Sequence, residues 1–326
     1  MPANLPPHLK AALARLTEGV ARSDITRRAE AISQTYRGGG GSATIRSEND
    51  ALAYALARMP ATYAAVSACI EAIAELDEVF APASLLDVGA GPGTATWAAA
   101  QAIHSLQQFA MLDANAALRG IALDLARGDG RFKQLDYRQG DALVELSVAH
   151  EADLVVASYA IGEVADDRRA KLIDLMWRKT RDVLLVVEPG TPAGYNRIVD
   201  CRTQLIASGA HVIAPCPHRM PCPLAAPDWC HFTQRLARSR DHKQLKNAEV
   251  PFEDEKFSYV AVSRTPRGTH PAARVLAQPS MTKVEIKAKL CNRDGTASIL
   301  AIPRRDKEAY ATARRWRWGD AVQGIS

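Results

Sequence analysis

The fold is decided by the stretch SLLDVGAGPGTATWAAA, residues 84–100. Its first six residues are an apolar run of strand length, and an alanine-rich stretch with helical character follows from Thr94. Between them lie Gly89, Gly91 and Gly93, and glycine lets a backbone turn sharply and approach a ligand without a Cβ in the way. The free N–H groups at the start of a helix bind a carboxylate or a phosphate. The stretch therefore predicts a strand, a ligand-binding turn and a helix.

The same alternation continues toward the C-terminus. Four later apolar runs are each followed by a stretch with helical character: FAMLD (109–113), FKQLDY (132–137), ADLVVASY (152–159) and DVLLVVEPG (182–190). Such alternation indicates βαβ units and a parallel, doubly wound sheet. The first 80 residues, in contrast, are expected to be all-helical. Ser47 and Asp50 there have the form of a capping box, and Pro60 should break or kink the helix that they open.

After residue 210 this alternation ends in a loop rich in cysteine and proline. Four short strand-like runs follow: FSYVAVSR (257–264), ARVLAQPS (273–280), KVEIKAKLC (283–291) and TASILAIPR (296–304). Their spacing is typical of a small β-barrel or meander. We therefore expect an α/β protein with an N-terminal helical region (1–80), a nucleotide-binding domain (81–210) and a β-rich extension (211–326).

Charge is distributed unevenly along the 326 residues. The net formal charge is +5, yet residues 1–230 carry 22 Lys and Arg against 26 Asp and Glu, whereas residues 231–326 carry 19 against 10. A basic C-terminal third on a mildly acidic body indicates contact with polyanions, nucleic acid first. A solvated basic face without a partner is the alternative.

The chain shows neither a membrane span nor a secretion signal in its sequence. No run approaches the roughly 18–20 apolar residues of a membrane helix, and the first residues lack a charged start followed by an apolar block. Glu18 and Asp24 argue against a transit peptide, which is poor in acidic residues. We therefore expect a cytoplasmic protein.

The spacing of the glycine loop indicates its ligand. From Asp87 to Gly93 it reads D-x-G-x-G-x-G, which is neither the dinucleotide pattern G-x-G-x-x-G nor a P-loop. It resembles the first motif of class I S-adenosylmethionine-dependent methyltransferases. The resemblance implies that the following residues bind the cofactor: Asp87, Gly89, Ala90, Gly91, Gly93, Asp113, Asp141 and Ser158. The alternatives are a glycine loop that only turns the chain, and a domain that binds the cofactor without transferring the methyl group.

Three of these residues lie at or just after the ends of successive predicted strands. By the same resemblance, Asp113 would meet the ribose hydroxyls, Asp141 the adenine amino group, and Ser158 would lie beside the reacting methyl group. The sequence assigns no catalytic residue, because the fourth strand ends in ASYAIGEV and carries no motif for a particular acceptor. Glu163 and Glu188 are candidates for positioning or proton removal. Methyl transfer can also run on positioning alone, so activity stays open.

The chain has six cysteines, and without a secretion signal a disulfide framework is not expected. Cys69 and Cys201 lie in helix-like segments and are most simply small buried apolar residues. The other four form the pattern Cys216-x5-Cys222-x7-Cys230, with Cys291 farther along the chain. Four thiolates match either a tetrahedral zinc site or a four-iron cluster.

Two features of this pattern bear on the choice of metal. The tight C-x2–4-C knuckle that is usual for structural zinc is absent, and the wide, proline-rich spacing favours the larger cluster. His211, His218 and His231 lie in the same region, however, so a mixed Cys/His zinc site is a second possibility.

A wider resemblance covers about residues 5–320. It is carried, in this order, by RMPATYAAV (58–66), the glycine motif, EPGTPAGYNRI (188–198), CPHRMPCPL (216–224), DWCHF (228–232) and EDEKFSYV (253–260). Together these segments resemble the methyltransferase-like proteins of the mitochondrial small ribosomal subunit and their bacterial relatives. The resemblance implies a Rossmann-like class I methyltransferase sheet with an N-terminal helical region and a small β-rich extension stapled by a [4Fe–4S] cluster.

The same resemblance implies cluster ligation by Cys216, Cys222, Cys230 and Cys291. It also implies that the partner is small-subunit rRNA with its assembly intermediates, and not a membrane or DNA. Three functions stay open: an rRNA methyltransferase, a non-catalytic RNA-binding assembly factor, and a zinc-stapled methyltransferase with another acceptor.

The basic C-terminal third supplies the candidate RNA contacts, because guanidinium groups bind phosphates. These residues are Arg235, Arg238, Arg240, Lys243, Lys246, Arg314, Arg315 and Arg317. The tryptophans of RRWRW (314–318) could stack on unpaired bases or pack the last helix against the β-rich part.

Overall fold

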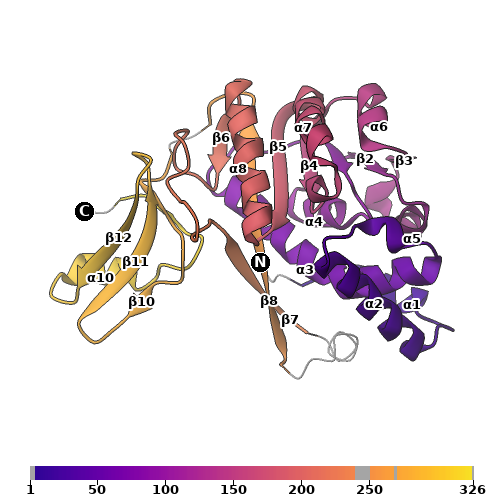
Figure 1. Ribbon diagram of the computed structural model, residues 1–326, viewed down its shortest axis with the longest axis horizontal. Helices are drawn as coiled ribbons and strands as arrows, with labels where there is room; N and C mark the ends of the chain where they lie inside the picture. Colours follow the sequence, from indigo (N-terminus) through magenta and orange to yellow (C-terminus); the bar gives the residue numbers. More distant parts are fainter. Residues whose placement is uncertain (1–3, 239–249, 268–269, 325–326) are drawn as a thin grey trace.

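A computed structural model of the chain describes residues 4–238, 250–267 and 270–324 (Figure 1). Its centre is a sheet of eight strands in the order β3-β2-β1-β4-β5-β8-β6, with β7 also paired to β8. The strands are β1 (Ser84–Val88), β2 (Gln108–Asp113), β3 (Leu135–Gln139), β4 (Ala152–Ser158), β5 (Thr180–Pro189), β6 (His211–Ala214), β7 (Phe232–Ala237) and β8 (Phe252–Ser263). The five strands from β1 to β5 pair in parallel, while β8 is antiparallel to its neighbours.

Helices cover both faces of this sheet. One face packs on α3 (Glu48–Ala74), α4 (Thr94–Ala102) and α5 (Ala116–Ala126), and the other on α6 (Ala142–Val148), α7 (Asp166–Lys179) and α8 (Pro192–Ala207). Successive strand residues point to opposite faces, so Leu85 joins the first core and Leu86 the second. Burial on both faces explains why these strands read as continuous apolar runs. The α/β, Rossmann-like fold expected from the sequence is confirmed.

The N-terminal helices α1 (Pro7–Leu16), α2 (Arg22–Arg37) and α3 extend the first core. The expected break at Pro60 is wrong, because α3 runs through this residue as one helix. A proline in a helix removes one backbone hydrogen bond. Here most of α3 is buried against α4, α2 and β8, and packing of this kind outweighs local propensity.

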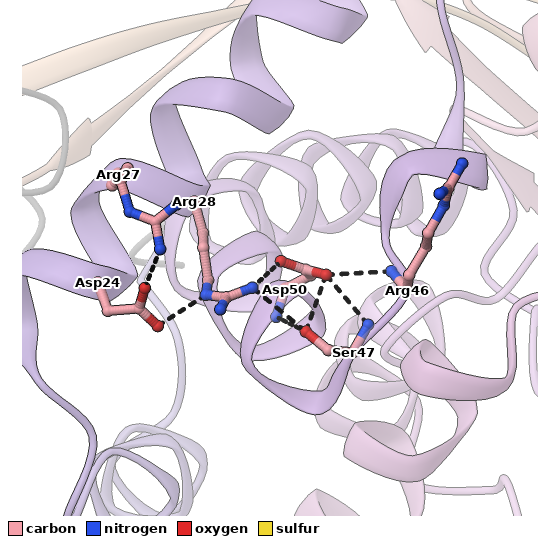
Figure 2. Close-up of polar contacts among 6 residues, drawn as sticks. All are labelled: Asp24, Arg27, Arg28, Arg46, Ser47 and Asp50. Carbon is pink, nitrogen blue, oxygen red and sulfur yellow. Dashed lines mark hydrogen bonds and ion pairs between the residues drawn. The ribbon is translucent and has the colours of Figure 1, made fainter.

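Figure 2 shows how α2 is joined to the start of α3. The capping box is confirmed: the Asp50 backbone N–H donates to Ser47 Oγ over 3.2 Å, and the Asp50 carboxylate accepts from the Ser47 backbone N–H over 3.0 Å. Arg28 of α2 donates to Asp50 over 2.5 Å and to Asp24 over 2.7 Å. The guanidinium of Arg28 therefore pairs with Asp24 of its own helix and links α2 to α3 through Asp50.

A second sheet lies beside the β6 and β8 edge of the first, drawn in yellow in Figure 1. It contains β9 (Ala273–Val275), β10 (Ser280–Met281), β11 (Glu285–Asn292), β12 (Ala297–Pro303) and β13 (Ala321–Val322), and α10 (Lys307–Ala313) packs on it. The run 257–264 was expected among these strands, but it belongs to β8 in the central sheet. The reason is that Phe257–Ser263 is buried on both faces and contributes to both cores.

The division of the chain at residue 210 stays a prediction, since the central sheet takes strands from both sides of it. Among the described residues, no helix combines the length and the apolar character needed to cross a membrane.

Candidate functional site

The glycine loop joins β1 to α4, as the sequence predicted. Gly89, Gly91 and Gly93 have φ angles of 70°, 54° and 78°, the left-handed region that side chains rarely adopt. A Cβ on Gly89 would also lie 2.4 Å from the Cβ of Ala160, just beyond the end of β4. The loop therefore requires glycine both for its backbone conformation and for its close approach to the neighbouring strand.

Asp87, the acidic residue of this motif, is fully buried. Its Oδ2 accepts from the backbone N–H of Thr96 over 3.1 Å and from the Thr96 hydroxyl over 2.8 Å. Its Oδ1 has no partner among the described residues. Burial raises the pKa of this carboxyl to about 7. Asp87 thus holds the first turn of α4 against β1.

Asp113, at the end of β2, is brought to the same loop. Its carboxylate accepts from the backbone N–H of Gly91 over 2.8 Å and from that of Asn115 over 2.7 Å. Burial raises the pKa of Asp113. The Tyr137 hydroxyl of β3 donates to the carbonyl of the same glycine, Gly91, over 2.8 Å. The structure therefore unites the glycine loop with the residue expected at the ribose.

Asp141 is not joined to this group by a hydrogen bond. Its carboxylate caps α6 by accepting from the backbone N–H of Leu143, and both its oxygens accept from Arg168 over 2.8 and 2.9 Å. The hydrogen bonds from Arg168 lower the pKa of Asp141. Ser158 ends β4 and is half-buried. Asp141 thus follows the third strand, β3, as expected, but its carboxylate is already paired with Arg168.

The two candidate carboxylates are both engaged. Glu163 accepts from the Tyr36 hydroxyl over 3.0 Å, and from the backbone N–H and the hydroxyl of Ser42 over 2.9 and 2.6 Å. Glu188 is fully buried and pairs with Arg197 over 2.7 Å, while burial raises its pKa. Both carboxylates are therefore engaged by the fold, and Glu188 Oε1 is the one oxygen of the pair that is buried and without a partner among the described residues.

Sequence reasoning missed Asn115 and, for Tyr159 at the end of the fourth strand, its contact with Glu255. The Asn115 side-chain amide donates to the carbonyls of Ser42 and Ile45, so it anchors the segment that also reaches Glu163. Tyr159 has φ 56° and donates its hydroxyl to Glu255 over 2.8 Å, across from the end of β4. These contacts join residues 70 or more positions apart, and no local pattern marks them.

The four candidate metal ligands line one cavity at the junction of the two sheets. Cys216, Cys222 and Cys230 come from the loop between β6 and β7, and Cys291 comes from β11. Burial raises the pKa of Cys216, Cys230 and Cys291, and the neighbouring thiols add to this effect. Among the described residues, no three Cys, His, Asp or Glu side chains converge as ligands of a single metal ion. The structure therefore gathers the four thiols without showing the metal staple.

Hydrogen bonds also reach these sulfurs. The Tyr195 hydroxyl donates to Cys222 Sγ over 3.1 Å, and His218 Nε2 lies 3.3 Å from Cys291 Sγ. Of the other histidines, His231 stacks on Trp229, and His211 lies in β6. The remaining cysteines, Cys69 and Cys201, are fully buried in the two cores, as expected.

The candidate RNA-binding residues differ in whether their side chains are ion-paired within the protein or exposed. Arg235 pairs with Asp254 over 2.7 and 2.8 Å, and Arg238 pairs with Glu253 over 3.3 Å. Arg314, Arg315 and Arg317 are exposed after α10. Arg240, Lys243 and Lys246 lie outside the described residues.

The tryptophans of the last segment are packed against the protein. Trp318 donates its indole N–H to the His231 carbonyl over 2.8 Å, and Trp316 contacts the apolar residues of the second sheet. This arrangement favours the packing interpretation over stacking on bases.

Curated proteins similar to the chain include a human and a fission-yeast protein. The human "Ribosome assembly protein METTL17, mitochondrial" is 30% identical over 302 residues, which cover 84% of this chain and 63% of that protein. The "Rsm22-cox11 tandem protein 2, mitochondrial" of Schizosaccharomyces pombe is 23% identical over 321 residues, covering 82% of this chain and 42% of that protein. The chain thus spans less than two thirds of the length of these relatives.

Solved structures resemble the chain more distantly. The magnesium protoporphyrin IX methyltransferase of Synechocystis with bound SAM is 13% identical with a TM-score of 0.42, covering 71% of this chain and 90% of that one. The precorrin-6y C5,15-methyltransferase of Geobacter metallireducens is 14% identical with a TM-score of 0.40, covering 60% and 85%. The fold assignment rests on the strand order of the central sheet.

The cytoplasmic location expected from the sequence is wrong, because both curated relatives and the matching family are named mitochondrial. The expectation depended on acidic residues near the start of the chain. Asp24 lies in the folded helix α2, where Arg28 binds it, so its charge serves the fold and carries no information about targeting.

The family model described as "Mitochondrial small ribosomal subunit Rsm22" matches residues 48–323. This range includes the glycine loop, Asp113 and the four cysteines of the cavity. The resemblance drawn from the sequence motifs is thereby confirmed, and the chain belongs to the Rsm22 family.

Proposed function

We propose that the chain is a methyltransferase-like protein that binds S-adenosylmethionine and acts on the mitochondrial small ribosomal subunit during its assembly, through rRNA. A [4Fe–4S] cluster at the four cysteines is part of the proposal. The observation that carries it is the cavity in which Cys216, Cys222, Cys230 and Cys291 meet between two sheets. The name of the human relative, a ribosome assembly protein, supports the role in assembly.

The residues of the glycine loop fit S-adenosylmethionine. The left-handed glycines allow close approach of a ligand, and the N–H groups at the start of α4 favour its carboxylate. Asp113, held at the loop by Gly91, would accept hydrogen bonds from the ribose hydroxyls. Asp141 would accept from the adenine amino group with the acceptor sites that Arg168 and Leu143 leave unused. Bound there, the cofactor would supply an electrophilic methyl group.

The donor set of the cysteine cavity fits a four-iron cluster, which proteins hold by four thiolates. Three of the thiols belong to the loop beside the central sheet and the fourth to β11 of the second sheet. A group bound by all four would therefore tie the second sheet, and the basic residues after it, to the cofactor domain. A small β-sheet gains stability from such ligation.

A role in assembly without methyl transfer is favoured by the engagement of Glu163 and Glu188. Glu163 accepts three hydrogen bonds from the N-terminal segment, and Glu188 is paired with Arg197. Both carboxylates are thus held by the fold, although Glu188 Oε1 has no partner among the described residues. We therefore propose binding to the subunit as the main function, ahead of methyl transfer.

The cluster is tested by metal analysis of protein purified without oxygen. We expect iron and acid-labile sulfide in near-equal amounts in the wild type, and loss of both in Cys222→Ser. Cys69→Ala is the matched control, because this thiol is buried in α3 within the first core. Zinc without sulfide would support the zinc site in place of the cluster. The absence of both iron and zinc from folded protein would refute a metal site.

The role in assembly is tested by incubating the protein and radiolabelled S-adenosylmethionine with immature small subunits. An assembly factor would be supported if the protein co-sediments with the particles, if the cysteine variant does not, and if Gly91→Ala still does. Label in the rRNA that Gly91→Ala abolishes would show methyl transfer. Absence of co-sedimentation by the intact, metal-loaded protein would refute the proposal.

A further inference from the structure

Two buried arginines face the cysteine cavity without a carboxylate partner. Arg202 of α8 is 4% exposed and Arg274 of β9 is 2% exposed, and both line the cavity. A buried guanidinium is costly unless an anion lies near it. Among the described residues, both side chains donate to neutral backbone carbonyls and neither forms a salt bridge. Arg202 also interacts with Cys216, where it opposes the rise in the pKa of that thiol that burial causes.

These carbonyl bonds do not use all of the donors. Arg202 donates to the carbonyls of His218 and Met220 over 2.8 and 3.0 Å, and Arg274 donates to those of Pro215 and Gly319 over 2.8 and 2.7 Å. Arg202 Nε and Arg274 Nη2 are buried and have no partner among the described residues. An unsatisfied buried donor costs about 1–3 kcal/mol.

The four sulfurs of the same cavity supply the missing anion once they bind a metal group. Cysteine binds metal as the thiolate, and four thiolates carry more negative charge than the iron core of a cluster neutralises. Tyr195 already directs its hydroxyl at Cys222 Sγ, and His218 lies against Cys291 Sγ. The cavity wall is mostly apolar, and Tyr195, Arg202 and Arg274 are the lining side chains that bring N–H or O–H donors to the sulfurs.

We infer that Arg202 and Arg274 are positioning residues that donate their free N–H groups to the sulfurs of the group held by the four cysteines and offset its negative charge. This inference rests on the proposed cluster. Both arginines also fix the ligand loop, since their carbonyl bonds reach Pro215, His218 and Met220, next to Cys216 and Cys222.

The inference has a measurable electrochemical consequence. Hydrogen bonds to the sulfurs and nearby charge set the reduction potential of an iron–sulfur cluster. Cationic donors stabilise the more negative, reduced form more than the oxidised form, so they raise the potential. Replacing either arginine by a neutral residue should lower it, which a purely structural role would not require.

The test uses the full chain purified without oxygen, as the wild type, Arg202→Met, Arg274→Met, Arg202→Lys and Arg274→Lys. Iron and sulfide per chain, resistance to a chelator, and the midpoint potential from a dye-mediated titration are measured for each. Outer partners of metal ligands typically contribute 10–100-fold to metal affinity, so we expect the methionine variants to retain iron roughly tenfold less well. Their remaining clusters should have a more negative potential, and the lysine variants, which keep the charge, should lie between.

The control is Arg197→Met, on the same helix as Arg202. Arg197 pairs with the buried Glu188 and does not line the cavity, so its loss should destabilise the fold without moving the potential. Wild-type potential and iron retention in both methionine variants would overturn the inference while leaving the cluster in place. If methionine prevents folding, unchanged potentials in both lysine variants overturn it. A wild type without iron and sulfide would refute the cluster, and the inference with it.

Discussion

At the scale of single residues, Asp87 shows how a sequence motif serves the fold before it serves a ligand. Its carboxyl lies in the interior with one oxygen on Thr96 and the other without a partner among the described residues. Burial raises its pKa from 3.8 to about 7. The folded state therefore holds this proton more tightly than the unfolded chain does.

The pH dependence of stability follows from that shift. The contribution of Asp87 to stability is fully present below pH 3.8 and is lost as the pH rises through about 7. Asp87→Asn removes the titration, so its free energy of unfolding should fall less than that of the wild type between pH 4 and pH 7. The difference is on the order of 4 kcal/mol at most.

Urea unfolding of the protein at several pH values measures this difference. Asp167→Asn, at an exposed carboxyl of α7, should keep the wild-type dependence. Parallel curves for Asp87→Asn and the wild type would show that the Asp87 carboxyl does not titrate in this range.

At the scale of elements, α3 shows local and tertiary effects acting on one helix. Its start is specified locally, because Ser47 and Asp50 satisfy each other's backbone N–H groups. Its continuation through Pro60 is not local, since a proline in isolation would end the helix. The helix continues through Pro60 because α3 is packed between the other helices and β8.

Removal of the cap should destabilise the protein by a predictable amount. Ser47→Ala deletes the acceptor for the Asp50 backbone N–H, and such losses cost about 1 kcal/mol. Ser33→Ala, inside α2, replaces serine by a better helix former and should leave stability unchanged or slightly raised. Thermal unfolding of both variants measures the difference, and equal stabilities would mean that the cap contributes nothing.

At the scale of the whole molecule, the cysteine cavity lies between the central sheet and the second sheet, which carries the basic end of the chain. Arg314, Arg315 and Arg317 follow α10 on the second sheet, which the cavity joins to the first. Their exposure makes them better candidates for phosphate contacts than Arg235, which is already paired with Asp254.

The salt dependence of binding tests whether these three arginines contact phosphates. Each phosphate contact adds roughly 0.7–0.9 to the slope of log affinity against log salt. Changing Arg314, Arg315 and Arg317 to glutamine should therefore reduce the slope for small-subunit rRNA by about 2. The control changes three other surface cations, Arg127, Lys133 and Arg178, to glutamine. A slope that falls equally in both variants would place the RNA elsewhere.

Much of the central domain could be predicted from the sequence, because the patterns that specify it are local. The central motif consists of the apolar run 84–88, the glycines after it and the helix from Thr94, which follow one another directly. Their spacing alone therefore predicts a strand, a turn and a helix. The capping box at Ser47 is local in the same way. The family motifs also named the four cysteines, which the structure then brings to one cavity.

Contacts between distant segments were decided by tertiary structure. The burial of β8 on both faces places it in the central sheet, where its sequence alone resembled the strands that follow it. Glu163 is occupied by Ser42, and Arg274 meets the cysteine loop 59 residues away. Side chains of this kind acquire their role from the neighbours that folding supplies, whereas a turn or a cap carries its partners a few residues along the chain. Local chemistry therefore determined the elements and the glycine loop, and long-range packing determined which charges stay free and which sulfurs share a wall with two arginines.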